Sequence, residues 1–146
     1  MFYIFVIHGF IFLKNKCIME EEKNNFAKKE NKMEKINLIK EVNSVNELYI
    51  YKKIAHLNGH TLSVVNVENR TLDFHIHENS DELFYVIEGS FVLETEDKRT
   101  QVNDGEFIIV PKGTLHRPVV TSLCKFLMIE LDGTLNKSNS GDLYED

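Results

Sequence analysis

The stretch Asp73-Phe-His-Ile-His-Glu-Asn-Ser-Asp-Glu-Leu-Phe-Tyr-Val-Ile-Glu-Gly89 decides how this chain folds. In an extended strand, successive side chains point to opposite faces, so residues two apart share a face. His75 and His77 are two apart, and we expect both imidazoles to project the same way from one short strand. The polar residues 78–81 are typical of a turn, and an apolar run follows them. A strand, a turn and a second strand would bring Glu82 back beside the two histidines.

A second stretch, Gly105-Glu-Phe-Ile-Ile-Val-Pro-Lys-Gly-Thr-Leu-His116, supplies one more histidine. Its apolar run 107–110 predicts a strand, and Pro111-Lys-Gly113 is a turn signal that ends the strand. No local spacing connects His116 with His77. His116 must therefore reach the first block from another pair of strands.

Together, His75, His77, Glu82 and His116 form a ligand set for one divalent metal. Three imidazoles and one carboxylate suit Zn, Fe, Mn, Ni or Co better than Ca or Mg, which prefer oxygen ligands. Taken singly, each residue has an ordinary explanation as a core histidine or a surface carboxylate. Their joint occurrence in two blocks framed by glycines and a proline favours a metal site. The ligand types alone do not choose among the five metals.

The two blocks resemble the two sequence motifs of the cupin superfamily. The first motif is Gly-x5-His-x-His-x3–4-Glu-x6-Gly, and the second is Gly-x5-Pro-x-Gly-x2-His-x3-Asn. The matching positions here are His75, His77, Glu82, Gly89, Gly105, Pro111, Gly113 and His116. Two positions differ, because Asn69 stands in place of the first glycine and Val120 in place of the last asparagine. Asparagine tolerates a left-handed backbone, so Asn69 can serve in a turn as a glycine would.

The resemblance covers roughly residues 50–132. It implies an all-β jelly-roll, also called a double-stranded β-helix barrel, whose interior holds the metal. The likeness is strongest to short single-domain cupins similar to mannose-6-phosphate isomerase, which share the segments 81–84 and 116–119. It implies the fold and the ligand set, and it does not imply the isomerase reaction.

The chain is organised around one predicted barrel domain over residues 33–134. We expect residues 1–32 to be a disordered extension, or sequence upstream of a start at Met19 or Met33, because 20–32 are rich in charge and asparagine. Residues 135–146 are predicted to be a flexible tail.

Regular polar turns separate the strands that the pattern predicts. Besides the short strand with His75 and His77, these strands cover 48–57, 60–67, 83–88, 90–95, 99–102, 107–110, 116–120 and 125–131. A short edge strand around Leu38 and one or two helical turns within 41–48 are expected to precede them. The fold class is therefore an all-β barrel with a short N-terminal strand-helix extension.

Composition excludes several classes of partner. The 146 residues carry a net charge of −6, and an acidic domain argues against nucleic acid. The apolar residues 1–13 are too few to span a bilayer as a helix, so no membrane partner is expected. Cys17 and Cys124 are the two cysteines, and so few favour a reduced, cytoplasmic protein without a disulfide.

Both faces of the strand 83–87 are apolar, and so is the whole run 107–110. A strand with one solvated face would alternate instead. We therefore expect the outer face to be covered, either by the N-terminal strand around Leu38 or by another subunit. A homodimer is the prediction.

Strand alternation also predicts which side chains surround the metal. The expected pocket residues are Phe84, Val86, Val120, Phe126 and Met128. Arg117 should point away from the metal because it adjoins His116. His56 and His60, which flank an Asn-Gly turn, are interpreted as surface or structural residues.

The pattern leaves the reaction open. One hypothesis is a metal-dependent enzyme in which the metal acts as a Lewis acid or a dioxygen site, such as an isomerase, a dioxygenase or a decarboxylase. The alternative is a non-catalytic module that binds a metal or a small metabolite in the barrel. A third interpretation is a metal held only for stability. No catalytic acid, base or nucleophile stands out, so the catalytic residues stay unknown.

Overall fold

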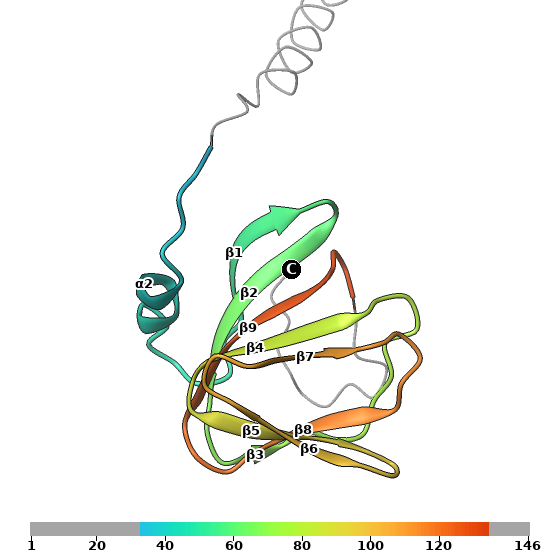
Figure 1. Cartoon of the computed structure of the whole chain (residues 1–146). Helices are drawn as coiled ribbons and strands as arrows, with labels where there is room; N and C mark the ends of the chain where they lie inside the picture. The colour runs from blue at the N-terminus through green and yellow to red at the C-terminus, as the bar shows by residue number, and fades with distance from the viewer. Residues whose placement is uncertain (1–32, 135–146) are drawn as a thin grey trace, which may run out of the picture. The chain divides into compact units, whose positions relative to one another are not determined.

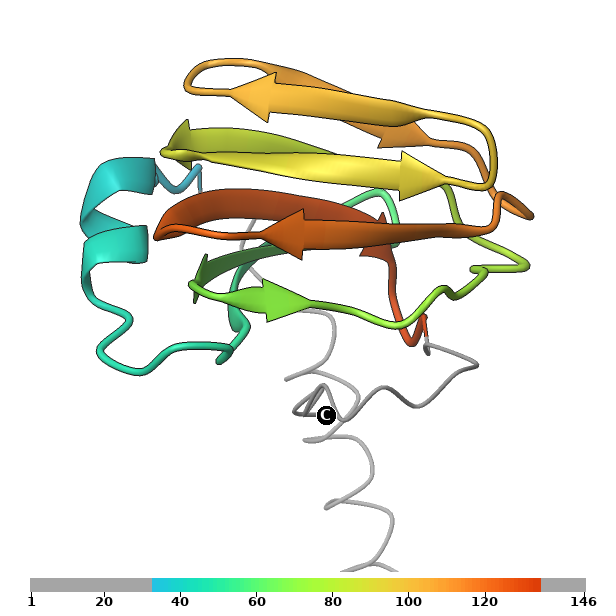
Figure 2. The same ribbon diagram turned by 90° about the horizontal axis from the view of Figure 1, so that it is seen from below.

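The computed structural model describes residues 33–134, which form one short helix and two antiparallel sheets (Figure 1). The elements are α2 (Leu38–Asn43), β1 (Lys52–Leu57), β2 (His60–Val67), β3 (Arg70–Thr71), β4 (Glu82–Glu88), β5 (Ser90–Thr95), β6 (Arg99–Asn103), β7 (Phe107–Val110), β8 (His116–Val120) and β9 (Cys124–Leu131). One sheet has the order β1-β2-β9-β4-β7 and the other the order β3-β8-β5-β6. Figure 2 is turned to look onto the four-stranded sheet, with α2 to one side. The predicted all-β jelly-roll barrel is confirmed.

An aromatic cluster fills the space between the sheets. Phe84 and Phe126 come from the five-stranded sheet and Phe91 from the four-stranded one, and each is 2% exposed. Their ring centroids lie 5.5 to 5.8 Å apart, a separation at which tilted aromatic pairs attract one another. Truncating a buried phenylalanine of this kind costs about 3–5 kcal/mol. The cluster therefore holds the two sheets together.

Two turns depend on backbone conformations that few residues adopt. Gly89 has a φ of 93°, and a Cβ there would lie 2.3 Å from the carbonyl oxygen of Leu123, so only glycine fits. Asn69 has a φ of 48°, which is the left-handed conformation predicted for it. The departure from the first cupin glycine is thus accommodated by the backbone.

The edge strand expected around Leu38 is not formed. Residues 38–43 are instead the helix α2, because the side chain of Asn37 accepts a hydrogen bond from the backbone N–H of Lys40 and caps its first turn. Val42 is the buried residue of α2, and the side-chain amide of Asn66 on β2 donates to the carbonyl of Val42. The helix therefore packs against the outer face of β2.

The segment with His75 and His77 is not a regular strand. His75 forms a single antiparallel bridge with His116, in which each backbone N–H donates to the other residue's carbonyl. The backbone N–H of Gly113 donates to the carbonyl of His77. The two histidines are thus fixed onto residues 111–116 rather than onto β4, and the two-residue strand β3 before them was not predicted.

The outer face of β4 and β7 stays apolar and open among the described residues. Phe107 is 61% exposed and Ile109 is 52% exposed. Their cross-strand partners are Tyr85 and Leu83, which are half-buried. The helix α2 packs against β2, and Phe107 and Ile109 stay exposed, so the expectation that something covers this face stays a prediction.

Several predictions lie outside the described residues: the extension 1–32 with Cys17 and Met19, and the tail 135–146. The boundaries of the domain therefore stay predictions. Cys124 is fully buried in the core, and burial raises the pKa of its thiol to about 12. No helix within residues 33–134 is long and apolar enough to cross a membrane.

Candidate metal centre

The four predicted ligands converge at one point inside the barrel. His75 and His77 lie in the loop before β4, Glu82 is the first residue of β4, and His116 is the first residue of β8. One ligand atom from each of the four lies within 4.8 Å of the others. None of the four side chains is more than 3% exposed. We call these four residues the cluster.

The carboxylate of Glu82 lies at the centre of the contacts within the cluster. Its Oε2 is 3.1 Å from Nε2 of His116 and 3.4 Å from Nε2 of His77. The ring centroid of His75 is 4.4 Å from that of His116 and 5.1 Å from that of His77. The donor atoms therefore surround a common space.

Two backbone carbonyls fix which ring nitrogens face the cluster. Nδ1 of His75 is 2.8 Å from the carbonyl oxygen of Asp73, and Nδ1 of His116 is 2.8 Å from that of Thr114. A carbonyl oxygen can only accept, so each Nδ1 must carry the hydrogen and donate it. In a neutral imidazole this leaves Nε2 with its lone pair. Metal-binding histidines are oriented by hydrogen bonds of this kind.

Burial and neighbouring groups shift the pKa values of His75 and Glu82 toward the forms that bind a metal. Burial lowers the pKa of His75, with a backbone hydrogen bond to Asp73 opposing it. Burial opposes ionisation of Glu82, but hydrogen bonds and charge from His116 and His77 outweigh burial and lower the pKa of that carboxyl. Neutral imidazoles and an ionised carboxylate are the forms that bind a divalent cation.

Glu130 on β9 is a buried carboxyl group that the sequence analysis did not single out. It is 7% exposed, and its Oε2 has no hydrogen-bond partner among the described residues. Burial, and then the charge of Glu82, raise its pKa to about 8. Phe126 and Met128 were predicted to face the interior. Glu130 lies two residues beyond Met128 on the same face of β9. The alternation of inward-facing residues along this strand could therefore have identified it from the sequence.

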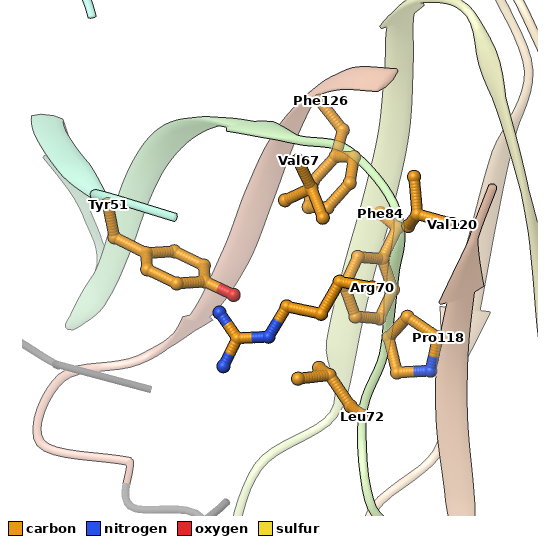
Figure 3. Close-up of a pocket in the computed structure, with 8 residues that line it drawn as sticks. All are labelled: Tyr51, Val67, Arg70, Leu72, Phe84, Pro118, Val120 and Phe126. Carbon is orange, nitrogen blue, oxygen red and sulfur yellow. The ribbon is translucent and has the colours of Figure 1, made fainter. Parts of the chain in front are cut away.

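The five predicted pocket residues are divided among three places. Phe84, Val120 and Phe126 line one small cleft, which Figure 3 shows. Met128 lines a second cleft together with Glu130. Val86 is fully buried and lines neither. Whether these residues contact a ligand stays a prediction.

The remaining predicted positions lie away from the cluster. Nδ1 of His56 is 3.1 Å from a carboxylate oxygen of Asp132, and Nδ1 of His60 is near the carbonyl of Asn58. Arg117 donates from Nε to Glu94 on the outer side of the four-stranded sheet. The interpretation of His56 and His60 as structural, and of Arg117 as pointing outward, agrees with these contacts.

Comparison with known proteins identifies the family. Residues 63–130, which contain the whole cluster, match the sequence model of the cupin domain. The chain is 37% identical over 82 residues to the uncharacterized protein YdbB of Bacillus subtilis (strain 168), and this match covers 56% of the chain and 72% of YdbB. This chain is a cupin.

Solved structures with the same fold include a cupin-2 domain protein. A cupin-2 domain protein from Shewanella frigidimarina superposes with a TM-score of 0.63 at 30% identity, covering 66% of this cupin and 93% of that chain. Protein NMB1881 from Neisseria meningitidis gives a TM-score of 0.61 at 27% identity, covering 68% and 100%. Quercetin 2,3-dioxygenase of Bacillus subtilis is 40% identical over 42 residues, which is 29% of this cupin but 12% of that enzyme. The expected likeness to mannose-6-phosphate isomerase stays a prediction.

Proposed function

We propose that this cupin binds one divalent transition metal, Zn, Fe, Mn, Ni or Co, through His75, His77, Glu82 and His116. We further propose that it binds a small molecule in the barrel beside that metal. The observation that carries the proposal is the orientation of the cluster. His75 and His116 use Nδ1 to donate to backbone carbonyls, and Nε2 of His116 and of His77 lies near the buried carboxylate of Glu82.

Electrostatics explain why such a group of atoms needs a cation. Lone pairs of imidazole nitrogens and carboxylate oxygens repel one another when no positive charge lies between them. The ion-pair partners of Glu82 within residues 33–134 are the imidazoles of His77 and His116, and no lysine or arginine of that range reaches it. A proton or a metal ion can fill this role, and the nitrogen and oxygen donors fit a transition metal.

When bound, a divalent metal at this site supplies Lewis-acid polarisation of a ligand oxygen, and a redox-active metal also supplies a site for dioxygen. The chain's own residues would exclude water and hold a proton. The apolar side chains of Phe84, Val120 and Phe126 exclude water from the interior next to the cluster. The carboxyl group of Glu130 can hold a proton at Oε2 near neutral pH.

Metal content tests the first half of the proposal. The protein is purified without chelators or reconstituted with each of the five metals, dialysed, and analysed by mass spectrometry for elements. We expect about one metal per chain, as for a single four-ligand site. His77→Ala should lose most of the metal, whereas His56→Ala, a histidine outside the cluster, should keep it. Equal metal content in the two variants would contradict the proposed ligand set.

An enzyme and a binding module predict different results with the metal-loaded protein. The local likeness to quercetin 2,3-dioxygenase makes dioxygen chemistry the first reaction to test. Oxygen uptake with a panel of small molecules, abolished in His77→Ala, would favour an enzyme. A ligand that raises the melting temperature without being consumed would favour the non-catalytic module.

We also propose that the protein is a homodimer. The apolar outer face of β4 and β7 supports this, since Phe107 and Ile109 are each more than half exposed there. Exposed apolar patches of this kind are typical of interfaces between proteins. An edge strand such as β7 also leaves unpaired backbone groups that a second copy can cover.

A further inference from the structure

The cleft that Met128 and Glu130 line lies against the inner faces of β1, β2 and β9. Its volume is about 40 Å³, roughly three times the 10–15 Å³ that one water molecule needs. The hydrogen-bonding side chains in its walls include Lys53 on β1, Thr61 and Ser63 on β2, and Glu130 on β9. We call this site the Glu130 cleft.

The register of the sheet brings these side chains onto one inner surface. Thr61 pairs with Glu130, and Ser63 pairs with Met128, across β2 and β9. Cross-strand partners share a face, and these four residues are between 3% and 9% exposed. The inner end of the cleft is therefore shielded from bulk water.

The other end of the cleft reaches the surface. Lys53 is the cross-strand partner of Ser63 on the edge strand β1, and it is exposed. Gly133, which also lines the cleft, is exposed as well. A ligand can therefore place one end beside Glu130 while its body stays at the mouth between Lys53 and Gly133.

Glu130 is also the neighbour of a proposed metal ligand. Leu83 on β4 pairs with Ile129 on β9. The next residues along these antiparallel strands are Glu82 and Glu130, which therefore lie opposite one another. Both side chains are buried on the inner side of the sheet. The Glu130 cleft thus adjoins the cluster.

Glu130 brings an unsatisfied hydrogen-bonding group to the inner end of the cleft. Its Oε2 has no partner among the described residues, and leaving a buried polar atom unpaired is costly. An ionised Oε2 accepts a hydrogen bond, whereas a protonated one donates. A hydroxyl group both donates and accepts, so it satisfies Glu130 in either protonation state. A carboxylate or an ammonium group can serve only one of the two states.

The size and the walls of the cleft favour a neutral group. A charged group that entered would lose its water and gain a single buried carboxyl group in exchange, so its burial is costly. A cationic group would also have to pass the ammonium group of Lys53 at the mouth. A hydroxymethyl group has two heavy atoms and one hydroxyl, and it therefore suits both the small volume and Glu130.

We propose that the Glu130 cleft binds the terminal hydroxymethyl group of a small neutral alcohol or polyol, with the hydroxyl on Oε2 of Glu130. The hydroxyl of Ser63 lines the same cleft and offers a second partner. This inference names the class of the small molecule proposed to bind in the barrel, and to that extent it rests on the proposed function. The cleft and its side chains do not depend on the metal.

The test is an NMR titration of the full chain, both as purified and after treatment with a chelator. The probes are n-propanol, propionate and propylammonium, which share a three-carbon body and differ in their terminal group. For so small a ligand we expect a dissociation constant on the order of 10 mM for n-propanol, and at least about tenfold weaker binding of the two ions. The largest ¹H–¹⁵N shifts should fall on Ser63, Glu130 and Gly133.

Substitutions of Glu130 identify the group that binds the hydroxyl. Glu130→Leu removes the hydrogen-bonding atoms and should weaken n-propanol binding about tenfold. Glu130→Gln keeps a donor and an acceptor, so it should bind n-propanol within about threefold of the wild type. Equal weakening by the two substitutions would show that the charge of the carboxylate, and not a hydrogen bond to a hydroxyl, holds the probe.

A second pair of variants tests the volume of the cleft. Ser63→Ile adds two heavy atoms, as many as a hydroxymethyl group has, and should abolish saturable binding. Thr100→Ile introduces the same side chain on β6 of the other sheet and should bind n-propanol as the wild type does. Circular dichroism checks that each variant folds. If Glu130→Leu or Ser63→Ile does not fold, the probe preference and the shift map of the wild type decide.

Three further results would overturn the assignment. They are equal binding of the three probes, unchanged n-propanol binding by folded Glu130→Leu, and shifts that map elsewhere. Failure of the wild type to saturate at about ten times the expected dissociation constant would show that the cleft holds only water. Binding confined to the metal-containing sample would also count against it, since the hydroxyl would then be a metal ligand.

Metal content is measured on the same samples. A protein that binds n-propanol beside Glu130 but takes up no metal would leave this inference standing while the proposed metal site fails. A protein that takes up metal but does not bind n-propanol would do the reverse.

Discussion

Two buried glutamates on opposite sheets of this cupin differ in the groups that neutralise their carboxylate charge. Glu94, 7% exposed, lies on the outer side of the four-stranded sheet, 2.9 Å from a guanidinium nitrogen of Arg99 and 2.7 Å from Nε of Arg117. Glu82, 2% exposed, lies inside the barrel, and its ion-pair partners within the described residues are two imidazoles. Within residues 33–134, the first site has two permanent cations and the second has none.

The difference indicates which of the two sites is suited to bind a cation. An ionised carboxylate away from water needs a positive partner, and Glu94 has two that stay charged at any physiological pH. Neutral imidazoles cannot serve Glu82 in this way, so a proton on an imidazole or the proposed metal would have to supply the positive charge. The outer side of the four-stranded sheet thus neutralises its own buried carboxylate, whereas in the barrel interior the proposed metal would do so.

The largest effect on the free energy of unfolding is expected at Glu130, whose Oε2 has no hydrogen-bond partner among the described residues. Its pKa is raised from 4.5 to about 8 in the folded protein, so the folded state keeps a proton that the unfolded chain releases. This contribution is fully present below pH 4.5 and is lost as the pH rises through 8. The size of the shift corresponds to a loss of about 5 kcal/mol in the free energy of unfolding.

Glu130→Gln should therefore make the metal-free protein less sensitive to pH. Urea unfolding at pH 5 and pH 8 measures the effect, with Glu96→Gln as an exposed control. We expect the wild type and the control to lose stability between the two pH values and Glu130→Gln to lose little. The same pH dependence in all three proteins would show that Glu130 is not the group responsible.

The next largest effect on the free energy of unfolding is expected from the metal proposed to bind beside Glu82. A metal that binds only the folded state, at about 100 times its dissociation constant, should raise the free energy of unfolding by roughly 3 kcal/mol. His116→Ala should abolish that increase, and His60→Ala should retain it. Differential scanning calorimetry with and without the metal makes the comparison, and equal stabilisation of both variants would contradict the assignment.

A smaller effect is expected at Glu94. Replacing Glu94 by Gln leaves Arg99 and Arg117 without their carboxylate and should destabilise the fold by about 1–3 kcal/mol. The metal content should not change, because this site lies on the other side of the sheet. A variant that loses metal along with stability would show that the two sites are coupled.

The smallest effect on folding is expected on the open outer face of β7. Ile109→Lys replaces a side chain that is 52% exposed, so the monomer should change in stability by less than about 0.5 kcal/mol. The proposed dimer, by contrast, should dissociate, because a lysine would have to be buried in its interface. Light scattering should give twice the chain mass for the wild type and one chain mass for the variant. A wild-type monomer at micromolar concentration would contradict the dimer.

Much of the barrel was predictable because its strands alternate and its turns carry strong signals. The bounds of β2, β7 and β8 agree with those predicted, and the four cluster residues were named from the sequence through the spacing within each block and the resemblance to the two cupin motifs. The Asn58–Gly59 turn before β2 has both residues at positive φ, as such a hairpin requires. For these strands and this turn, the local sequence was enough to predict the structure.

The errors arose where tertiary context decides. The apolar residues around Leu38 are too few to distinguish a strand from a helix, and the cap at Asn37 was the deciding signal. β3 is only two residues long and exists because β8 pairs with it. The stacking of Arg70 on Tyr49 joins residues that no sequence period connects. Contacts of this kind depend on the complete fold.

The most direct test of the central claim is a crystal structure of the metal-loaded protein with data collected at the absorption edge of that metal. We predict one strong anomalous peak per chain, within about 2.0–2.3 Å of nitrogen atoms of His75, His77 and His116 and of a carboxylate oxygen of Glu82. A fully loaded protein whose anomalous peak lies elsewhere, with the cluster closed by hydrogen bonds instead, would contradict it.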